Sequence, residues 1–380
     1  MKSKMQKYSR KNKKSKKNVK HYSRKNKMSK IRGGAHNPST FTRVSNKNII
    51  SAKDLHITSE FIKVDGEYLR ISANNSKEIC DILLNSKKTL TNFTIIDPKI
   101  SEKDIYSFFL YLIDHKNLTE LIISKYTKIF GEIIIKSISQ LLHLNNTITY
   151  LCISDSNIGN EGIIFLSQLL KSSKTILTQL DISGNKINNV GALELTKVLK
   201  TIPTFTILDI SNNDIGASGA SGILKFAGEL LINTKLTELN ISNNNIGIEG
   251  TLALSGILIL NKSFIKLTIL DISDNKIGNE GAGSLSKVIN VITTIIHLDI
   301  SNNEIDVGAG LFAKALTTNT TLLSLNISNN KIEDIGALEL VKALETNKTL
   351  IELDISGNNI EASIVKRLED VIKINEDNIK

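Results

Sequence analysis

Residues 177–187 read LTQLDISGNKI, and the chain returns to this eleven-residue pattern six more times. The later copies begin at Phe205, Leu236, Leu267, Ile295, Leu322 and Leu350, at intervals of 28, 31, 31, 28, 27 and 28 residues. Three weaker copies precede them: LTNFTIIDPKI from Leu90, LTELIISKYTK from Leu118 and ITYLCISDSNI from Ile148. Ten units with so regular a period, over residues 90–360, predict a repeat solenoid.

Each position of the pattern has an expected structural role. In Leu177-x-x-Leu180-x-Ile182, apolar and polar residues alternate, which predicts a short strand with one buried face. The asparagine after the strand should satisfy backbone groups that no strand pairing reaches, so that stacked copies form a ladder along the solenoid. These asparagines are Asn185, Asn213, Asn244, Asn275, Asn303, Asn330 and Asn358.

The second half of each unit changes to helical spacing. After Gly191, apolar residues fall at Ala192, Leu195 and Leu199. The same offsets recur at Ala282, Leu285 and Ile289, at Ala309, Phe312 and Leu316, and at Ala337, Leu340 and Leu344. The small Gly-Ala pair should allow each helix to begin close to its neighbour. Because one strand and one helix cannot bury their apolar faces alone, the units are expected to stack on a continuous core.

Units of this length that read LxxLDISxNxIxxxGAxxL resemble the ribonuclease-inhibitor-like leucine-rich repeats. That class includes the Ran GTPase-activating protein and the repeat region of the nucleotide-binding immune receptors. The resemblance covers most of residues 90–373. It implies an α/β fold, a horseshoe-shaped leucine-rich-repeat solenoid with a parallel sheet on the concave face and helices on the convex face. It also implies a protein-binding scaffold that is not an enzyme.

Both ends of the array are expected to be capped. Residues 46–89 form the predicted N-terminal cap, because FIKVDGEYLRIS from Phe61 has Asp65-Gly66 between two alternating runs, which favours a hairpin. A helix over 76–84 should follow, with Cys80 buried. Residues 361–380 form the predicted C-terminal capping helix and tail, with Ile364, Leu368 and Ile372 facing inward. The first three repeats carry Pro98, Tyr126 and Ser156 in place of the asparagine, which indicates capping or an end specialised for a partner.

Charge divides the chain unevenly. Residues 1–34 contain 15 Lys and Arg and no acid, which leaves 33 basic against 38 acidic residues in 35–380, a net charge of −5. We predict that residues 1–45 are a disordered basic arm, since they lack the apolar content to fold. Its interpretations stay open: a nuclear localisation signal, a contact to nucleic acid or an anionic surface, a segment that folds back on the concave face, or a solubilising tail.

The sequence carries no recognisable catalytic or metal-binding motif. Its six His are scattered, and neither a Cys-x-x-Cys pair nor a phosphate-binding loop occurs. Cys80 and Cys152 are interpreted as reduced thiols. No signal peptide or long apolar run is present, so we expect an intracellular protein, cytoplasmic or nuclear, without a membrane span. We also expect a monomer that needs neither cofactor nor metal.

The strand residues on either side of the buried leucine should point away from the core and form the concave face. Isoleucine and tyrosine there, mixed with acids, suit a protein partner that offers a hydrophobic anchor flanked by Lys or Arg. The aspartates are also common repeat sequence, which is the structural interpretation of them. The expected partner-binding residues are Tyr150, Gln179, Asp181, Ile207, Asp209, Glu238, Ile269, Asp271, His297, Asp299, Glu352 and Asp354.

Two other functions stay open at this point. One is a GTPase-activating protein like the Ran regulator, although the long acidic C-terminal tail of that regulator is missing here and the early repeats do not map onto it residue by residue. The other is a nucleic-acid-associated protein in which residues 1–34 are the binding element.

Overall fold

A computed structural model describes residues 54–58, 61–64, 67–70, 76–85, 89–96, 101–125, 132–172, 175–202, 204–216, 225–226, 228, 235–263 and 265–378. The predicted disordered arm of residues 1–45 lies outside these residues, as do Asp65-Gly66, Pro98 and Tyr126. Within the described residues, no helix is long and apolar enough to cross a membrane.

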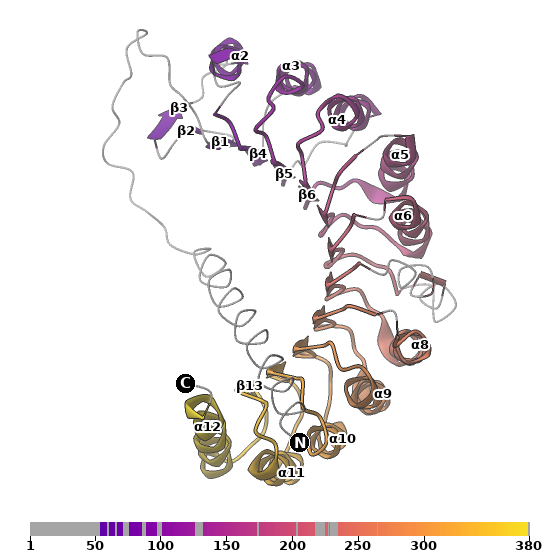
Figure 1. Ribbon diagram of the computed structural model, residues 1–380, viewed down its shortest axis with the longest axis vertical. Helices are drawn as coiled ribbons and strands as arrows, with labels where there is room; N and C mark the ends of the chain where they lie inside the picture. Colours follow the sequence, from indigo (N-terminus) through magenta and orange to yellow (C-terminus); the bar gives the residue numbers. More distant parts are fainter. Residues whose placement is uncertain are drawn as a thin grey trace, which may run out of the picture. The chain divides into compact units, whose positions relative to one another are not determined.

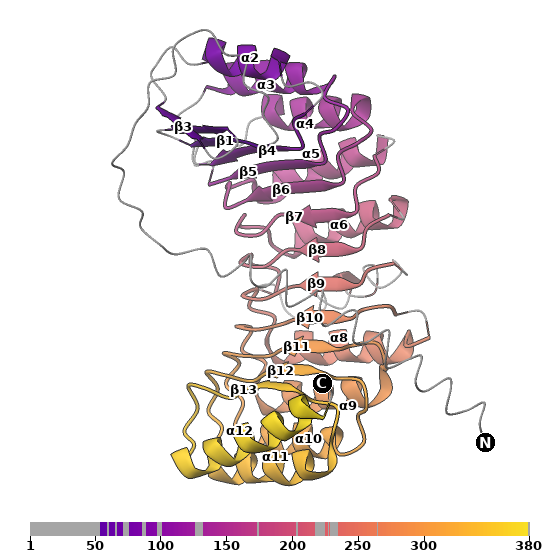
Figure 2. The same ribbon diagram turned by 60° about the vertical axis from the view of Figure 1, so that its left-hand side comes forward.

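The repeats form one parallel sheet on the concave face and a row of helices on the convex face, as predicted (Figures 1 and 2). Each strand pairs in parallel with the strand of the next repeat. The repeat strands are β4 (Asn92–Ile96), β5 (Glu120–Ser124), β6 (Tyr150–Ser154), β7 (Gln179–Asp181), β8 (Ile207–Asp209), β9 (Glu238–Asn240), β10 (Ile269–Asp271), β11 (His297–Asp299), β12 (Ser324–Asn326) and β13 (Glu352–Asp354).

Strands and helices alternate from β4 to α12 (Ala362–Asp377) except between β8 and β9, where most residues lie outside the described part of the chain. The apolar sides of the helices pack on a continuous core. The helices between the strands are α3 (Glu102–Leu112), α4 (Glu132–Leu144), α5 (Gly159–Ser172), α6 (Asn189–Thr201), α8 (Gly247–Leu260), α9 (Gly278–Val291), α10 (Gly308–Leu316) and α11 (Asp334–Thr346). The close approach expected of the glycines is present. A Cβ added to Gly308 would lie 2.9 Å from the Cβ of Ala282 in the preceding helix, which leaves no room for a larger residue.

The N-terminal cap contains the predicted hairpin and one additional strand. Strands β2 (Phe61–Val64) and β3 (Glu67–Arg70) pair antiparallel, which confirms the hairpin. Strand β1 (Asp54–Thr58) was not predicted; it pairs antiparallel with β2 and parallel with β4, so it extends the parallel sheet ahead of the first repeat. Helix α2 (Ser76–Asn85) follows. Cys80 in this helix is half-buried rather than buried, so that expectation was wrong.

The predicted asparagine ladder is confirmed. Asn244 is fully buried, and its Nδ2 donates to the carbonyl oxygens of Ile210, Ile241 and Ser242 at 2.9, 3.0 and 3.1 Å. Its own N–H donates to Oδ1 of Asn275 in the next repeat at 2.9 Å. Each amide therefore joins neighbouring repeats where the strands have ended, and it satisfies backbone groups that would otherwise be buried without a partner.

The early repeats replace this amide with longer strand pairing. Strands β4, β5 and β6 have five residues each, whereas β7 to β13 have three. At the ladder position after β6, the buried Ser156 donates its single hydroxyl proton to the carbonyl oxygen of Ser154 at 2.8 Å. A hydroxyl has one donor and an amide has two, so Ser156 cannot bridge the repeats as asparagine does. The two strands instead pair over two additional positions, Ile123 with Ile153 and Ser124 with Ser154.

A helix follows the last repeat, within residues 361–380. Helix α12 (Ala362–Asp377) buries Ile364 and Leu368 against the last repeat, while Ile372 is half-buried. Asn375 of this helix is also fully buried, and its Nδ2 donates to the carbonyl oxygens of Asn347 and Leu350 at 2.9 and 3.0 Å. The cap therefore closes the core with apolar contacts and satisfies two carbonyl groups of the last repeat.

Candidate functional site: the concave face of the sheet

The strand register aligns the predicted concave residues in two columns that cross the sheet. The first column contains the strand residue before the buried leucine, and the second column contains the residue after it. The first column is Asn92, Glu120, Tyr150, Gln179, Ile207, Glu238, Ile269, His297, Ser324 and Glu352. The second column is Thr94, Ile122, Cys152, Asp181, Asp209, Asn240, Asp271, Asp299, Asn326 and Asp354.

These side chains are less exposed than the sequence suggested. Tyr150, Ile207 and Ile269 were expected to be exposed, but each is half-buried. His297 is 7% exposed and belongs to the buried residues, and its burial lowers the pKa to about 4. Among the acids of the two columns, those of the last strand, Glu352 and Asp354, are exposed, and the others are half-buried. Neighbouring strands are only about 4.8 Å apart, so side chains in one column shield one another from water.

The charge on this face has a single sign. From β4 to β13 the two columns contain eight acids and neither Lys nor Arg. In the second column the order from β7 to β13 is Asp, Asp, Asn, Asp, Asp, Asn, Asp. Like charges on adjacent strands repel, because the spacing is short and water screens them only in part. The strand register therefore maintains an uncompensated negative charge along the face.

One oxygen of each second-column aspartate has a structural role. Oδ1 of Asp271 accepts from the N–H of Ser273 at 3.0 Å and from its hydroxyl at 2.7 Å. Asn240 makes the same pair of bonds with Ser242, at 3.0 and 2.7 Å. Oδ1 of each aspartate therefore has a structural role in the turn, as expected for a residue that is common in such repeats. Since asparagine forms the same turn, the negative charge is not needed for it.

The second oxygen of each aspartate has a different environment. Nδ2 of Asn240 donates to Oδ2 of Asp209 at 2.9 Å, and Nδ2 of Asn326 donates to Oδ2 of Asp299 at 2.7 Å. Oδ2 of Asp271 receives no such bond, because the next residue in the column is Asp299. Asp271 is therefore half-buried beside a like charge, and no donor among the described residues lies within hydrogen-bond distance of its second oxygen.

The titration of these carboxyl groups reflects that environment. Burial, and then the charge of Asp299, raises the pKa of Asp271 to about 6. Burial and the charge of Asp181 raise the pKa of Asp209, and its hydrogen bonds from Ser211 and Asn240 oppose that shift. Both directions mean that the ionised carboxylates are held at a cost to the folded protein and would be stabilised by a cation.

The second column carries no charge at β6. Cys152 is 4% exposed, and its Sγ lies 3.4 Å from Oδ2 of Asp181 and 3.4 Å from Oγ of Ser154. Burial and the charge of Asp181 raise the pKa of Cys152 to about 12. Burial also raises the pKa of Tyr150. Both groups are therefore neutral at physiological pH, and the charged part of the second column begins at Asp181.

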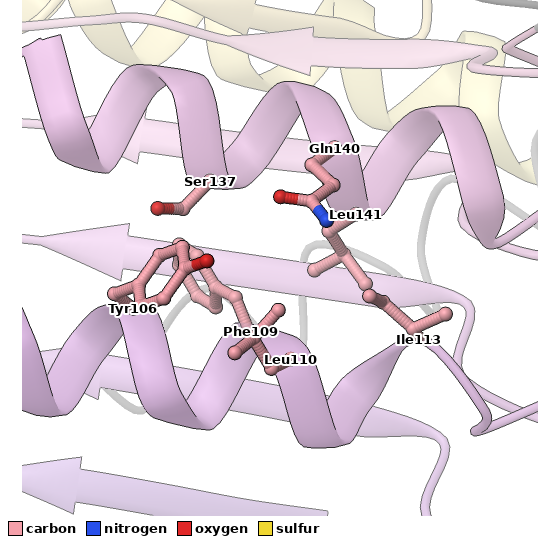
Figure 3. A pocket seen from close by; sticks show the side chains of 7 residues that line it. All are labelled: Tyr106, Phe109, Leu110, Ile113, Ser137, Gln140 and Leu141. Carbon is pink, nitrogen blue, oxygen red and sulfur yellow. The ribbon is translucent and has the colours of Figure 1, made fainter.

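The convex face has a small groove between α3 and α4 (Figure 3). It contains about 140 Å³ of space open to solvent and is lined by Tyr106, Phe109, Leu110, Ile113, Ser137, Gln140 and Leu141. Tyr106 and Leu110 are 39% and 42% exposed. Pockets for small ligands are larger, roughly 300–1,000 Å³. Among the described residues, no group of three His, Cys, Asp or Glu is placed to hold a metal ion.

Comparison with known proteins identifies the repeat. A model of the leucine-rich repeat matches residues 144–167, 173–195, 201–224, 233–255, 265–286, 318–341 and 346–368. No curated protein matches the chain.

Several solved structures are similar. Actin-binding site 2 of leiomodin-1 is 24% identical with a TM-score of 0.37, over 41% of this chain and 91% of that chain. The C-terminal domain of Caenorhabditis elegans tropomodulin is 16% identical with a TM-score of 0.35, over 42% and 95%. TLR13 in its complex with ssRNA13 is 18% identical with a TM-score of 0.47, over 75% of this chain and 35% of that chain. The segments that the repeat model matches are leucine-rich repeats, and the strands and helices of the described residues form an α/β solenoid of such repeats.

Proposed function

We propose that this protein is a non-enzymatic scaffold that binds a protein partner on the concave face of its sheet. Stacked repeats of this kind generally create extended concave surfaces on which proteins bind. The observation that carries the proposal is the composition of this surface: eight acids without Lys or Arg, together with the half-buried Ile207 and Ile269. We also propose that the repeats are of the ribonuclease-inhibitor-like kind, because units of 27 to 31 residues alternate one strand with one helix.

The arrangement favours a partner with apolar anchors and basic side chains. Ile207 on β8 and Ile269 on β10 flank Glu238 on β9, and Asp209 and Asp271 follow on the same strands as the isoleucines. A partner that covers the isoleucines gains apolar burial, and its cations relieve the repulsion among the acids. A nucleic acid on this face is disfavoured, because its phosphates would meet the same negative charge.

The test is affinity capture with two matched double variants of the full chain. Ile207→Asp with Ile269→Asp changes the concave face, and Val307→Asp with Ile335→Asp changes side chains that are 70% and 75% exposed at the starts of α10 and α11. We expect the first variant to lose the partner that the unmodified chain captures and the second to keep it. The helical variant should melt close to the unmodified protein. The concave variant adds two charges at half-buried positions beside acids, so it should melt at a lower temperature, and circular dichroism shows whether it stays folded. Capture that survives the concave variant and fails with the helical one would refute the proposal.

A further inference from the structure

The order of residues in the second column indicates what the partner presents. Two aspartate pairs, Asp181 with Asp209 and Asp271 with Asp299, are separated by Asn240. Asn240 and Asn326 show that an uncharged residue builds the same turn at this position. At Asp209 and Asp271, where burial and a neighbouring carboxylate raise the pKa, stability alone would favour asparagine. These charges are therefore better explained by binding than by folding. They lie on an open face of the sheet, and neither column contains a basic residue.

Each aspartate pair offers acceptors that suit a guanidinium group. Oδ1 is occupied by the serine of the turn, so Oδ2 is the oxygen left for a partner. Among the described residues, none donates to Oδ2 of Asp271, and Oδ2 of Asp299 accepts one hydrogen bond, from Asn326. In the other pair, Oδ2 of Asp209 accepts from Asn240, and Oδ2 of Asp181 lies 3.4 Å from Sγ of Cys152. Each of the three bonded oxygens keeps a second lone pair. A guanidinium carries N–H donors in a planar fork and can bridge two neighbouring carboxylates, whereas an ammonium acts as a point charge.

The first column supplies the apolar half of the same recognition. Ile269 lies two residues before Asp271 on β10, about 6.7 Å along the strand. Ile207 has the same relation to Asp209 on β8. The aliphatic stem of an arginine can pack on the half-buried isoleucine while its head reaches the carboxylates. Each pair of aspartates therefore forms, with one isoleucine, a site for one long basic side chain.

The distance between the two sites determines the spacing of the basic residues. The midpoints of the pairs are three strand intervals apart, about 14 Å at 4.8 Å per interval. An extended chain that crosses the strands advances about 3.3 Å per residue and turns alternate side chains to the same side. Four residues cover about 13 Å, and the first and fifth side chains face the sheet together. A helix advances only about 6 Å in four residues, so two arginines four residues apart on a helix cannot reach sites about 14 Å apart.

We propose that the concave face binds an extended basic segment of the partner, which crosses the strands and places two arginines four residues apart. One arginine lies against Asp181, Asp209 and Ile207, and the other lies against Asp271, Asp299 and Ile269. The residue midway between them faces Glu238 and Asn240 on β9, where a polar side chain fits. This inference rests on the proposed function, because it specifies the chemistry of a partner at the same face.

The experiment uses labelled eleven-residue peptides of Gly, Ser and Thr that differ only in the positions of two arginines. The arginines stand two, three or four residues apart, so charge and composition stay the same. Binding to the full chain is measured by fluorescence polarisation at about 0.1 M salt, where long-range attraction is screened beyond about 10 Å. We expect the four-residue spacing to bind at least tenfold more tightly than the three-residue spacing, which turns the arginines to opposite sides.

Variants of the full chain show whether the aspartate pairs are responsible. Asp271→Asn with Asp299→Asn should reduce the affinity for the four-residue spacing to that for the three-residue spacing. Asp274→Asn is the matched control: Asp274 is exposed on the same repeat, outside both columns, in a left-handed conformation that asparagine adopts at Asn243 and Asn302. It should leave the affinity unchanged.

This inference would be overturned if all three peptides bound with equal affinity. It would also be overturned if Asp274→Asn reduced the affinity as much as Asp271→Asn with Asp299→Asn does. The capture experiment keeps the two proposals separate. If the Ile207→Asp and Ile269→Asp variant loses its partner while the peptides show no spacing preference, the concave face is the binding site and the arginine spacing is wrong. If that variant keeps its partner, the proposed function itself fails.

Discussion

Replacing Asp271 with asparagine should stabilise the folded protein at neutral pH. The substitution keeps the shape of the side chain and the oxygen that Ser273 uses, and it removes the charge that faces Asp299. The pKa of Asp271 rises from 3.8 to about 6 on folding, about two units. At 1.36 kcal/mol per unit this corresponds to about 3 kcal/mol at neutral pH, and partial exposure reduces the expected gain to about 1–2 kcal/mol.

The stabilisation expected from Asp271→Asn depends on pH. Because the pKa is raised, the folded protein binds more protons at this site than the unfolded chain between pH 3.8 and about 6. The stability of the unmodified protein therefore falls as pH rises through this window, and the loss is complete above pH 6. Near pH 3.5 the carboxyl group is mostly protonated in both states, so the variant and the unmodified protein should have nearly the same stability.

Urea unfolding of both proteins at pH 3.5, 5 and 7.5 measures this difference. We expect the variant to gain most at pH 7.5 and almost nothing at pH 3.5. Asp274→Asn removes one charge from the same repeat at an exposed site and should show no such trend. An Asp271→Asn protein that is no more stable at pH 7.5, or equally stabilised at all three pH values, would show that burial of this charge does not destabilise the fold.

Three further predictions follow from other buried groups. Asn244→Leu should destabilise the protein by about 1–3 kcal/mol in a thermal melt, because it removes three buried hydrogen bonds to carbonyl groups and the oxygen that accepts from the N–H of Ile215; an unchanged melt would show that this amide is not needed. Cys152 should resist a thiol reagent at pH 8, where a pKa of about 12 leaves a thiolate fraction of about 10⁻⁴, and rapid labelling of the native protein would contradict its burial. His297 should show no NMR titration between pH 5.5 and 8, since its pKa is about 4.

The fold could be predicted from the sequence because the strand pattern recurs in ten units and the ladder asparagine in seven of them. Period, strand alternation and the ladder asparagine agree in every unit from Leu177 onward, so one misread position cannot change the result. Strand β1 was missed because it occurs only once, without the leucine pattern that marks the others. A second set of buried amides was missed for a similar reason. Asn145 and Asn347 look like ordinary loop residues, yet both donate to carbonyl groups of the preceding repeat.

The candidate site was only partly predictable. Alternation along a strand shows which side chains face outward, and it gave both columns correctly. It cannot show how far neighbours in a column shield one another, because that depends on the size of the residues beside them on adjacent strands. For this reason His297 was expected on the surface and is buried. The hydrogen bonds that Asn240 and Asn326 donate could be found only from the register of adjacent strands, because the bonded residues are 31 and 27 positions apart in the sequence.

Binding of the paired arginines should weaken as pH falls from 7.5 to 5.5. The pKa of Asp271 is about 6 in the free protein, so a large part of this carboxyl group is protonated at pH 5.5 and cannot pair with a guanidinium. The charged groups that act on it are Asp299 on β11 and Asp209 on β8, while His297 stays neutral over this range. We expect the affinity of the four-residue peptide to fall several-fold in the unmodified protein. The Asp271→Asn variant should bind more weakly at pH 7.5 and show little further change at pH 5.5. A variant with the same pH profile as the unmodified protein would show that another group controls the titration, and that Asp271 does not contact the partner.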